Sequence, residues 1–533
     1  GKDFTEGRMN NIASALSGKI AGVDAVQSNA GAGSSSRVII RGNTSLNGNQ
    51  QPLYVVDGMP IDNQNRGPVT SSTQLNVDRG DGISSINPDD IASISVLKGG
   101  AAAALYGSQA ANGVVLITTK KGRTVKPEIR LFANYGLSSR GIQEYETVGT
   151  FDYYPLMWQA LKNGLVYPVT GVGQTDAVAS TNASNTIATQ LIYNPFNVPN
   201  SQVIGVDGKM NPSAQLLYND FNWFNGIERI GPRKEIGFSV SSKANKSDYT
   251  FSLNYLKDEG FVIRSDFQRV NGRIAVNSQI NSWLKAGVNV TANFVNSNQA
   301  AGDGSNTFIN PFVFARGIAP IYPVRAYTTA GAPVLDAFGT QWYDFGIHPG
   351  AINRPTGGSP GRHILYESLL NENVQKRNSI IARTNLEIKL APGLTYTPNV
   401  GIDIINQRNN TFQNKIVGDG VTSGGYASVS SNEFRTFSVN NLINYTKRFG
   451  KHEITALAGH EIQKTDDQFF SGSRRGINLD GNIQLANFVV LNGVDGSINR
   501  LRREAYLSRL NYGYSKKYYC SCLRLWSPKR KCS

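Results

Sequence analysis

Histidine is the residue most often used for metal binding and acid–base chemistry, and this chain of 533 residues contains only four. They are His348, His363, His452 and His460, and none has the spacing that places metal ligands on one face of a helix. His452 and His460 share a face of one predicted strand but lie too far apart along it to share a metal. No nucleophile elbow is present. The sequence therefore predicts that the chain is not an enzyme and holds no metal or cofactor.

Two other patterns could bind ligands, and both are weak. Residues 31–36 are rich in glycine and serine but lack the Gly-Lys-Ser/Thr ending of a phosphate-binding loop. Cys520, Cys522 and Cys532 are the only cysteines, and their spacing is poor for zinc. The net charge of +15 is dispersed and not gathered in long basic runs with interleaved aromatics, so we expect no nucleic-acid partner.

The elements of the first 128 residues indicate a small α/β domain. Three β-branched segments bounded by turn residues are predicted strands: 37–42, 53–58 and 113–119. Residues 87–91 read as a helix start, with an asparagine cap, proline at the first position and two acids near the positive end of the dipole. A further strand is predicted over 94–99, and a short helix over 10–16.

Charged residues and glycines of this domain have a structural interpretation beside a functional one. Arg37, Arg41, Asp57 and Lys98 could form ion pairs that hold the domain together, or could contact a substrate. The glycines suit turns or close approaches of the backbone, because glycine has no Cβ. We favour the structural interpretation for both groups.

Six short motifs occur along the first part of the chain, at 15–23, 40–42, 52–60, 86–91, 96–99 and 104–114. In the sequence and order of these motifs the chain resembles the plug domain of the SusC/RagA family of TonB-linked outer-membrane transporters. The resemblance assigns the plug motif to Arg41, Gly42, Tyr54, Asp57, Gly58, Lys98, Tyr106, Gly107, Asn112 and Gly113. One departure is Gly99-Gly100, where this family more often has Lys-Asp. The substrate-binding residues stay unassigned.

Alternation of apolar and polar residues dominates the rest of the chain. Tyr249, Phe251 and Leu253 fall on one face of a strand, whereas Thr250 and Ser252 fall on the other, so one face should be wet. Ten such segments are predicted: 129–139, 235–243, 248–258, 268–278, 283–294, 379–390, 393–404, 434–446, 451–463 and 505–514. The predicted fold is mainly β: a plug (1–128), then an incomplete antiparallel up-and-down transmembrane β-barrel (129–519).

The connections between these segments alternate between tight and long, as in a membrane barrel with short periplasmic turns and long outer loops. The first long loop, 140–234, contains Trp158 and Trp223. Such aromatic side chains suit stacking on sugars or peptides, and they equally suit packing inside the loop.

The chain is expected to be a fragment, because about ten strands cannot close around a plug. Residues 520–533 do not alternate and carry every cysteine, so we predict an atypical tail produced by a shift of reading frame near Tyr519. A cysteine-based metal or disulfide tail is the alternative. The segment that binds TonB should precede the plug, and we expect the N-terminus to be truncated.

The resemblance implies TonB-dependent import of oligosaccharides or peptides across the outer membrane of a Gram-negative bacterium. Its expected partners are a SusD-like lipoprotein, TonB, the substrate and outer-membrane lipid. The alternatives are a TonB-dependent siderophore or vitamin receptor and an outer-membrane adhesin.

Overall fold

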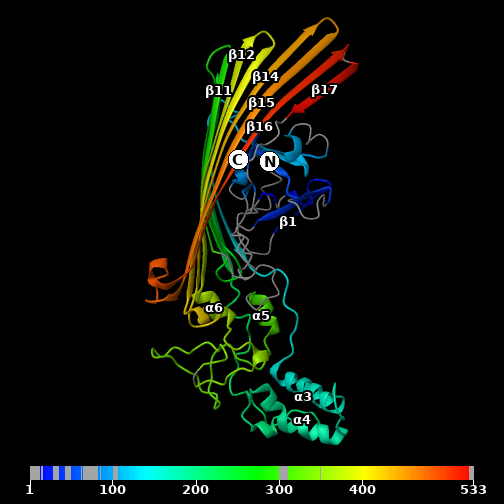
Figure 1. The fold of residues 1–533 in the computed structure, drawn as a ribbon, viewed down its shortest axis with the longest axis vertical. Helices are drawn as coiled ribbons and strands as arrows, with labels where there is room; N and C mark the ends of the chain where they lie inside the picture. The colour runs from blue at the N-terminus through cyan, green and yellow to red at the C-terminus, as the bar shows by residue number, and fades with distance from the viewer. Residues whose placement is uncertain are drawn as a thin grey trace.

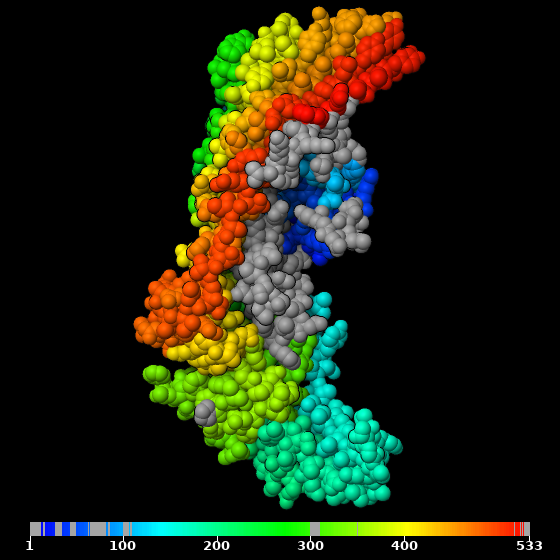
Figure 2. All heavy atoms as spheres, viewed as in Figure 1, coloured from blue at the N-terminus to red at the C-terminus, as the bar shows by residue number. Residues whose placement is uncertain are grey.

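The computed structural model describes residues 12–13, 16–27, 35–42, 50–61, 63, 82–83, 86–99, 106–298, 310–348, 350–515 and 517–526. The N-terminal domain lies beside a large curved sheet, and the helices of the longest connections lie beyond one end of that sheet (Figure 1). The space-filling view shows the N-terminal domain resting against one face of the sheet (Figure 2). No described helix is long and apolar enough to cross a membrane.

Two small sheets form the N-terminal domain. One is the antiparallel pair β1 (Val23–Gln27) and β2 (Ser36–Ile40). The other has the order β4-β3-β6-β5 and consists of β3 (Leu53–Val56), β4 (Met59–Ile61), β5 (Ile91–Leu97) and β6 (Val114–Thr119). The three β-branched segments predicted from the sequence are therefore confirmed as β2, β3 and β6. Their buried side chains share one core because alternate residues of each strand point to the same side.

The predicted helix start at residues 87–91 is confirmed, but the helix is a single 3-10 turn, η3 (Pro88–Asp90). Asn87 caps it, and its side-chain oxygen accepts a hydrogen bond of 3.1 Å from the Asp89 amide. The turn stops because Ile91 enters β5 and buries its side chain. A second 3-10 turn, η4 (Gly107–Ala110), precedes β6. The helix predicted over 10–16 lies mostly outside the described residues.

The large sheet has eleven strands, each antiparallel to the next in the chain. They are β7 (Glu128–Ser138), β8 (Gly231–Ala244), β9 (Ser247–Glu259), β10 (Asp266–Gln279), β11 (Leu284–Asn298), β12 (Glu372–Ala391), β13 (Leu394–Gln413), β14 (Tyr426–Phe449), β15 (His452–Ile477), β16 (Phe488–Tyr514) and β17 (Tyr518–Trp526). Within the described residues β7 and β17 form its two edges, so the sheet does not close into a barrel. The sequence predicted ten of these strands.

The two faces of the sheet have the reverse of the usual polarity. On β9 the outward side chains Phe251 and Leu253 are 38% and 49% exposed, whereas the inward Ser252 and Asn254 are 4% and 2% exposed. The polar face was expected to be wet, and that expectation was wrong, because the N-terminal domain covers this part of the face. A sheet that exposes its apolar side chains and buries its polar ones suits a lipid environment.

The strands on the β12–β16 side are longer than the alternation indicated. They run from 20 residues in β12 to 27 in β16. Most of the additional residues lie toward the long loops, for example 426–433 of β14 and 464–477 of β15. Both faces carry polar side chains there, so no apolar period marked these residues as strand.

Tight turns gather at one end of the sheet and long connections at the other. Residues 245–246, 392–393 and 450–451 are two-residue links. The long connections contain α3 (Thr150–Val166), α4 (Asp176–Leu191), η5 (Asn200–Gln202), α5 (Pro311–Gly317), η6 (Thr356–Gly358), α6 (Ile364–Leu370), η7 (Val421–Ser423) and η8 (Leu485–Asn487). The predicted difference between the two ends is therefore confirmed.

Candidate functional site

The Asp57–Gly58 turn is the point where the N-terminal domain reaches the large sheet. It joins β3 to β4, and both residues have positive φ angles, 48° for Asp57 and 86° for Gly58. Two consecutive positive φ values make a two-residue hairpin turn whose twist matches the flanking strands, and Asp-Gly is a favoured pair for it. The Asp57 carboxylate accepts hydrogen bonds from the Thr119 amide at 2.9 Å and from the Thr119 hydroxyl at 2.6 Å. The turn is thereby fastened to the end of β6.

Two side chains of the large sheet complete this contact. Asn289 on β11 donates a hydrogen bond of 2.7 Å to Asp57 Oδ2. Arg273 on β10 donates to Thr119 Oγ1 at 2.6 Å and to the Lys120 carbonyl at 3.1 and 3.2 Å. The Arg273 Nε also bonds Asn289 Oδ1 at 3.1 Å. Arg273 is only 2% exposed. Its guanidinium therefore joins the N-terminal domain to two adjacent strands of the sheet through charge-assisted hydrogen bonds.

Asp90, the last residue of η3, makes a second contact with the sheet. Its carboxylate accepts a hydrogen bond of 2.6 Å from Ser252 on β9, and its carbonyl accepts one of 2.8 Å from the Lys120 amide. Burial raises the pKa of Asp90, and the Ser252 hydrogen bond and the charges of Arg273 and Lys120 only partly oppose that rise. The neighbouring Asp89 lies 3.8 Å from Arg130 on β7.

The other predicted plug-motif residues make turns or contacts within the N-terminal domain. Tyr54 is buried in its core, and Arg41 and Gly42 take positive φ values after β2. Lys98 donates to the Ala21 carbonyl, and Asn112 donates to the Gln51 carbonyl at 3.4 Å. These contacts are those of a structural role.

Tyr106, Gly107 and Gly113 complete the predicted set. Gly113 has a φ of 93°, and a Cβ there would come within 2.8 Å of Ile40 and 3.1 Å of the Leu97 carbonyl. Only glycine fits such a position. Gly107 opens η4, and Tyr106, directly before it, is partly buried, with the charge of Glu461 on β15 nearby. No ligand-binding role of these residues has been tested, and the assignment stays a prediction.

The sheet residues of the contact, Arg273, Asn289 and Ser252, were not singled out by sequence reasoning. Each lies on the inward face of a predicted strand, and Ser252 was assigned to a wet face. The available signal for this contact was Arg273, an arginine on the same polar face as Asn271, two residues away. Which inward residue meets the N-terminal domain depends on how the two parts dock, and strand patterns do not contain that information.

The two longest connections pack together into one unit, residues 139–230 and 310–371, called here the loop body. Trp158 is 7% exposed and its indole donates to Ser184 at 2.8 Å; Trp223 is 3% exposed and donates to the Tyr322 carbonyl at 2.9 Å. Both tryptophans therefore belong to the core, and the packing interpretation holds over the sugar-stacking one. Apolar clusters from both connections merge around them.

Buried titratable groups lie inside the loop body. Arg354 Nε stands 3.7 Å from Asp344 Oδ2, and its Nη2 donates to the Asp344 carbonyl at 3.0 Å. Burial raises the pKa of Asp344 to about 6, against the opposing charge of Arg354. His363 Nδ1 accepts from the Tyr366 amide at 3.1 Å, which leaves Nε2 to donate to the Val324 carbonyl at 2.8 Å. Burial lowers the pKa of His363 to about 3, so it is neutral near pH 7.

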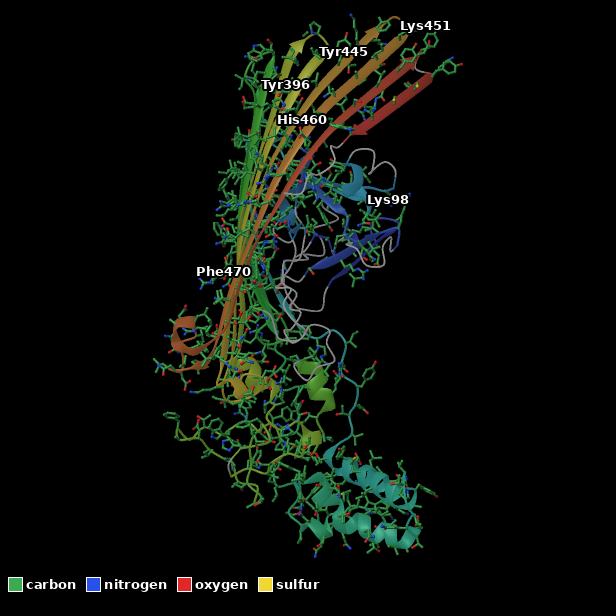
Figure 3. All side chains as sticks on the ribbon, viewed as in Figure 1. Lys98, Tyr396, Tyr445, Lys451, His460 and Phe470 are labelled. Carbon is green, nitrogen blue, oxygen red and sulfur yellow. The ribbon has the colours of Figure 1, made fainter. Side chains whose placement is uncertain are left out.

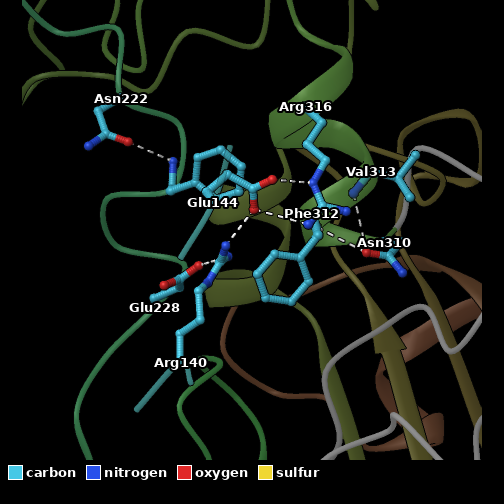
Figure 4. Close-up of polar contacts among 9 residues, drawn as sticks. Arg140, Glu144, Asn222, Glu228, Asn310, Phe312, Val313 and Arg316 are labelled. Carbon is cyan, nitrogen blue, oxygen red and sulfur yellow. Dashed lines mark hydrogen bonds and ion pairs between the residues drawn. The ribbon is translucent and has the colours of Figure 1, made fainter. Parts of the chain in front are cut away.

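An ionic cluster ties the two connections together near the sheet (Figure 4). Glu144 accepts hydrogen bonds from Arg316 at 2.8 and 3.0 Å and also from Arg140, which pairs with Glu228 as well. Arg316 and then Arg140 lower the pKa of Glu144 to about 2. The Arg140 guanidinium lies 5.0 Å from the ring centre of Phe312. The start of the first connection is thereby fixed to α5.

No group of three or more histidine, cysteine or acidic side chains with the arrangement of a metal site occurs among the described residues. Cys520 and Cys522 lie exposed on β17, and Cys532 is outside the described residues.

Comparisons with known proteins agree with this architecture. Residues 1–114 match the TonB-dependent Receptor Plug Domain. The chain is 27% identical to TonB-dependent receptor P39 of Formosa agariphila over 94% of the chain and 40% of that protein. It is 23% identical to TonB-dependent receptor SusC of Bacteroides thetaiotaomicron over 100% of the chain and 47% of that protein. The chain thus spans less than half the length of these relatives.

The fold is that of the RagAB peptide importer in its closed-closed state, with a TM-score of 0.71, 24% identity, and 99% of this chain and 54% of that one covered. A second structure, of the RagAB peptide transporter, gives a TM-score of 0.71 over 97% of this chain and 53% of that one. A plug docked on the inner face of an antiparallel barrel wall defines the class of TonB-dependent receptors. Within that class the chain is similar to SusC in sequence and to the RagAB transporter in fold.

Proposed function

We propose that this chain forms the plug and part of the barrel wall of a transporter that imports oligosaccharides or peptides in a TonB-dependent manner. The observation that carries the proposal is the plug–wall contact of Asp57, Thr119, Asn289 and Arg273, because it fixes a separate small domain against the inner face of the wall. All of its bonds are polar, and water can replace such bonds when the plug moves.

The polarity of the wall supports an outer-membrane location. Its outward face exposes apolar side chains such as Phe251, Leu253 and Phe437, which would be unfavourable in water over so wide a surface. The plug faces the opposite, polar side. The end with tight turns would then face the periplasm, and the loop body would lie outside the cell.

The substrate class and the partners come from similarity. The RagAB peptide importer supports peptides as substrates. The resemblance to the SusC/RagA type supports oligosaccharides as the other substrate class and a SusD-like lipoprotein partner beside TonB. A siderophore or vitamin receptor is the alternative within the class. An adhesin is the alternative outside it, since the loop body could bind a ligand without passing it on.

The test is uptake by cells that carry or lack the whole gene, with fluorescent oligosaccharides and fluorescent peptides supplied separately. We expect accumulation of one of the two only when both the gene and TonB are present, and loss of accumulation when the proton gradient is collapsed. Binding without TonB-dependent accumulation would favour the adhesin. Growth that depends on the gene only under iron or vitamin limitation would favour the siderophore or vitamin receptor.

A further inference from the structure

The outward face of the wall changes character from the turn end to the loop end. Near the turns it carries aromatic side chains, among them Tyr396 and Tyr445, whereas Phe470 lies far along β15 toward the loops (Figure 3). Apolar side chains such as Ile402 and Phe437 fill the region between them. Beyond the apolar region, toward the loops, several outward positions carry charged side chains.

Three pairs of basic residues occupy these charged positions in direct cross-strand register. They are Lys234 of β8 with Lys257 of β9, Lys376 of β12 with Arg408 of β13, and Lys464 of β15 with Arg502 of β16. All six are exposed, and the chain neighbours of each point to the other face of the sheet. The pairs recur on widely separated strands, so they form a girdle and not a single cluster.

Each basic pair lies just beyond an apolar or aromatic pair on the same face. Those pairs are Ile236 with Tyr255, Ile380 with Ile404, and His460 with Tyr506. Each is one or two outward positions nearer the turns than the corresponding basic pair. The three basic pairs therefore lie directly on the loop side of these apolar pairs, and Phe470 and Ile498 are exposed apolar side chains still nearer the loops.

Like charges directly opposite each other destabilise a sheet, and the acids of this chain offset only part of the charge. Lys257 bonds Glu259 at 2.7 Å, and Arg502 bonds Asp466 at 2.9 Å. Arg408 bonds the neutral side chain of Asn410 at 3.3 Å, and within the described residues no acidic side chain forms an ion pair with it. An anion between two facing cations would convert the repulsion into attraction.

We propose that the three basic pairs bind the phosphate groups of anionic lipids in the leaflet nearest the loop body. The inference rests on the proposed membrane location of the wall. A phosphate on the loop side of the apolar pairs lies at the height of the basic pairs, with its acyl chains along the apolar side chains below. Each basic residue near an anionic lipid surface strengthens association about fivefold.

The chain supplies a matched control on the same outward face. Lys447 of β14 is exposed like the six basic residues but lies near the turn end, two residues before Phe449. Its cross-strand neighbour is Ile454, so no second cation faces it. A lipid phosphate in the leaflet at the loop end cannot reach Lys447.

The experiment reconstitutes the protein in phosphatidylcholine vesicles that contain a trace of labelled phosphatidic acid or labelled phosphatidylcholine, and measures association of each lipid from energy transfer to the label. The wild type should prefer phosphatidic acid. The double variants Lys376→Gln with Arg408→Gln, and Lys464→Gln with Arg502→Gln, should each reduce that preference by roughly fivefold or more. Lys447→Gln, which removes a single cation that no second cation faces, should change it much less than either double variant, and circular dichroism checks that the sheet is intact in each variant.

Equal preference in the wild type and the double variants would overturn the lipid proposal while leaving the membrane location standing. A protein that inserts into neither kind of vesicle would overturn both. Displacement of phosphatidic acid by inorganic phosphate at constant ionic strength would show that the pairs bind free phosphate and not headgroups, which also overturns the proposal.

Discussion

The plug–wall contact and the loop body are both buried, yet opposite kinds of interaction hold them. Between plug and wall the bonds are polar and run through Asp57, Asp90 and Arg273. Inside the loop body, tryptophan, tyrosine and phenylalanine side chains from two distant connections interlock, as Trp223 does with Phe314 at a ring distance of 5.3 Å.

This difference separates a part that is able to move from a part built to stay assembled. A buried polar bond contributes little net free energy, because water offers equivalent partners once the groups are exposed. Buried aromatic surface has no such substitute, and exposing it costs the full transfer free energy. The plug is therefore expected to separate from the wall at a smaller cost than the loop body opens.

The largest expected effect tests the loop body. Trp223→Ala removes a buried ring and its hydrogen bond to Tyr322, and should lower the free energy of opening of the loop body by about 3–5 kcal/mol. Hydrogen exchange at the amides of α5 and α6 measures that free energy. Phe338→Ala is the matched control, because Phe338 belongs to the same unit and is 93% exposed. Equal effects of the two changes would mean that the aromatic core does not hold the loop body together.

A smaller effect is expected at the plug. Arg273→Met keeps most of the side-chain volume but removes the charged donor to Thr119, Lys120 and Asn289, and should lower the opening free energy of β6 by about 2–3 kcal/mol. Hydrogen exchange at β6 amides reports this change, with loop-body amides unaffected. Arg435→Met is the control, since Arg435 is exposed on the outward face of β14. If β6 exchange is unchanged in Arg273→Met, the proposed anchor does not hold the plug.

The sequence predicted the wall strands well where apolar and polar side chains alternate. Strand β9 alternates because Phe251 and Leu253 face outward while Ser252 and Asn254 face the lumen side. The loop-side part of β15 extends beyond the apolar region. Residues 464–477 therefore show no apolar–polar alternation from which a strand could be predicted. β17 pairs with β16 through its backbone although its side chains do not alternate.

The candidate site was only half predictable, because a motif shows which residues of the plug matter and not what they touch. Asp57 and Gly58 could be identified from turn chemistry and family resemblance. Their partners Arg273 and Asn289 lie more than two hundred residues later, on strands that contain many other polar inward residues. Which of them meets Asp57 depends on the docking of two separately folded parts.

The smallest expected effect concerns pH, and its sign differs between the two regions. Burial raises the pKa of Asp90, so the folded plug binds more protons than the unfolded one at pH values between the usual and the raised pKa. The associated stability is greatest in acid and is lost as pH rises through the raised pKa. Burial lowers the pKa of His363 to about 3, below its usual 6.5, so the stability of the loop body falls as pH drops through that window.

Acidification should therefore tighten the plug anchor while it loosens the loop body, by at most about 1.4 kcal/mol per pH unit for each group. Asp344, whose pKa is raised to about 6, opposes the His363 effect in the loop body, so each group is isolated by difference from a variant. Asp90→Asn and His363→Asn keep a hydrogen-bonding side chain but do not titrate. The opening free energies of β6 and α6 are measured by hydrogen exchange corrected for intrinsic rates. The difference in opening free energy between the wild type and the variant should change with pH in opposite directions for the two elements. Slopes of the same sign would show that charge burial does not distinguish the two regions, and the contrast between them would then rest on packing alone.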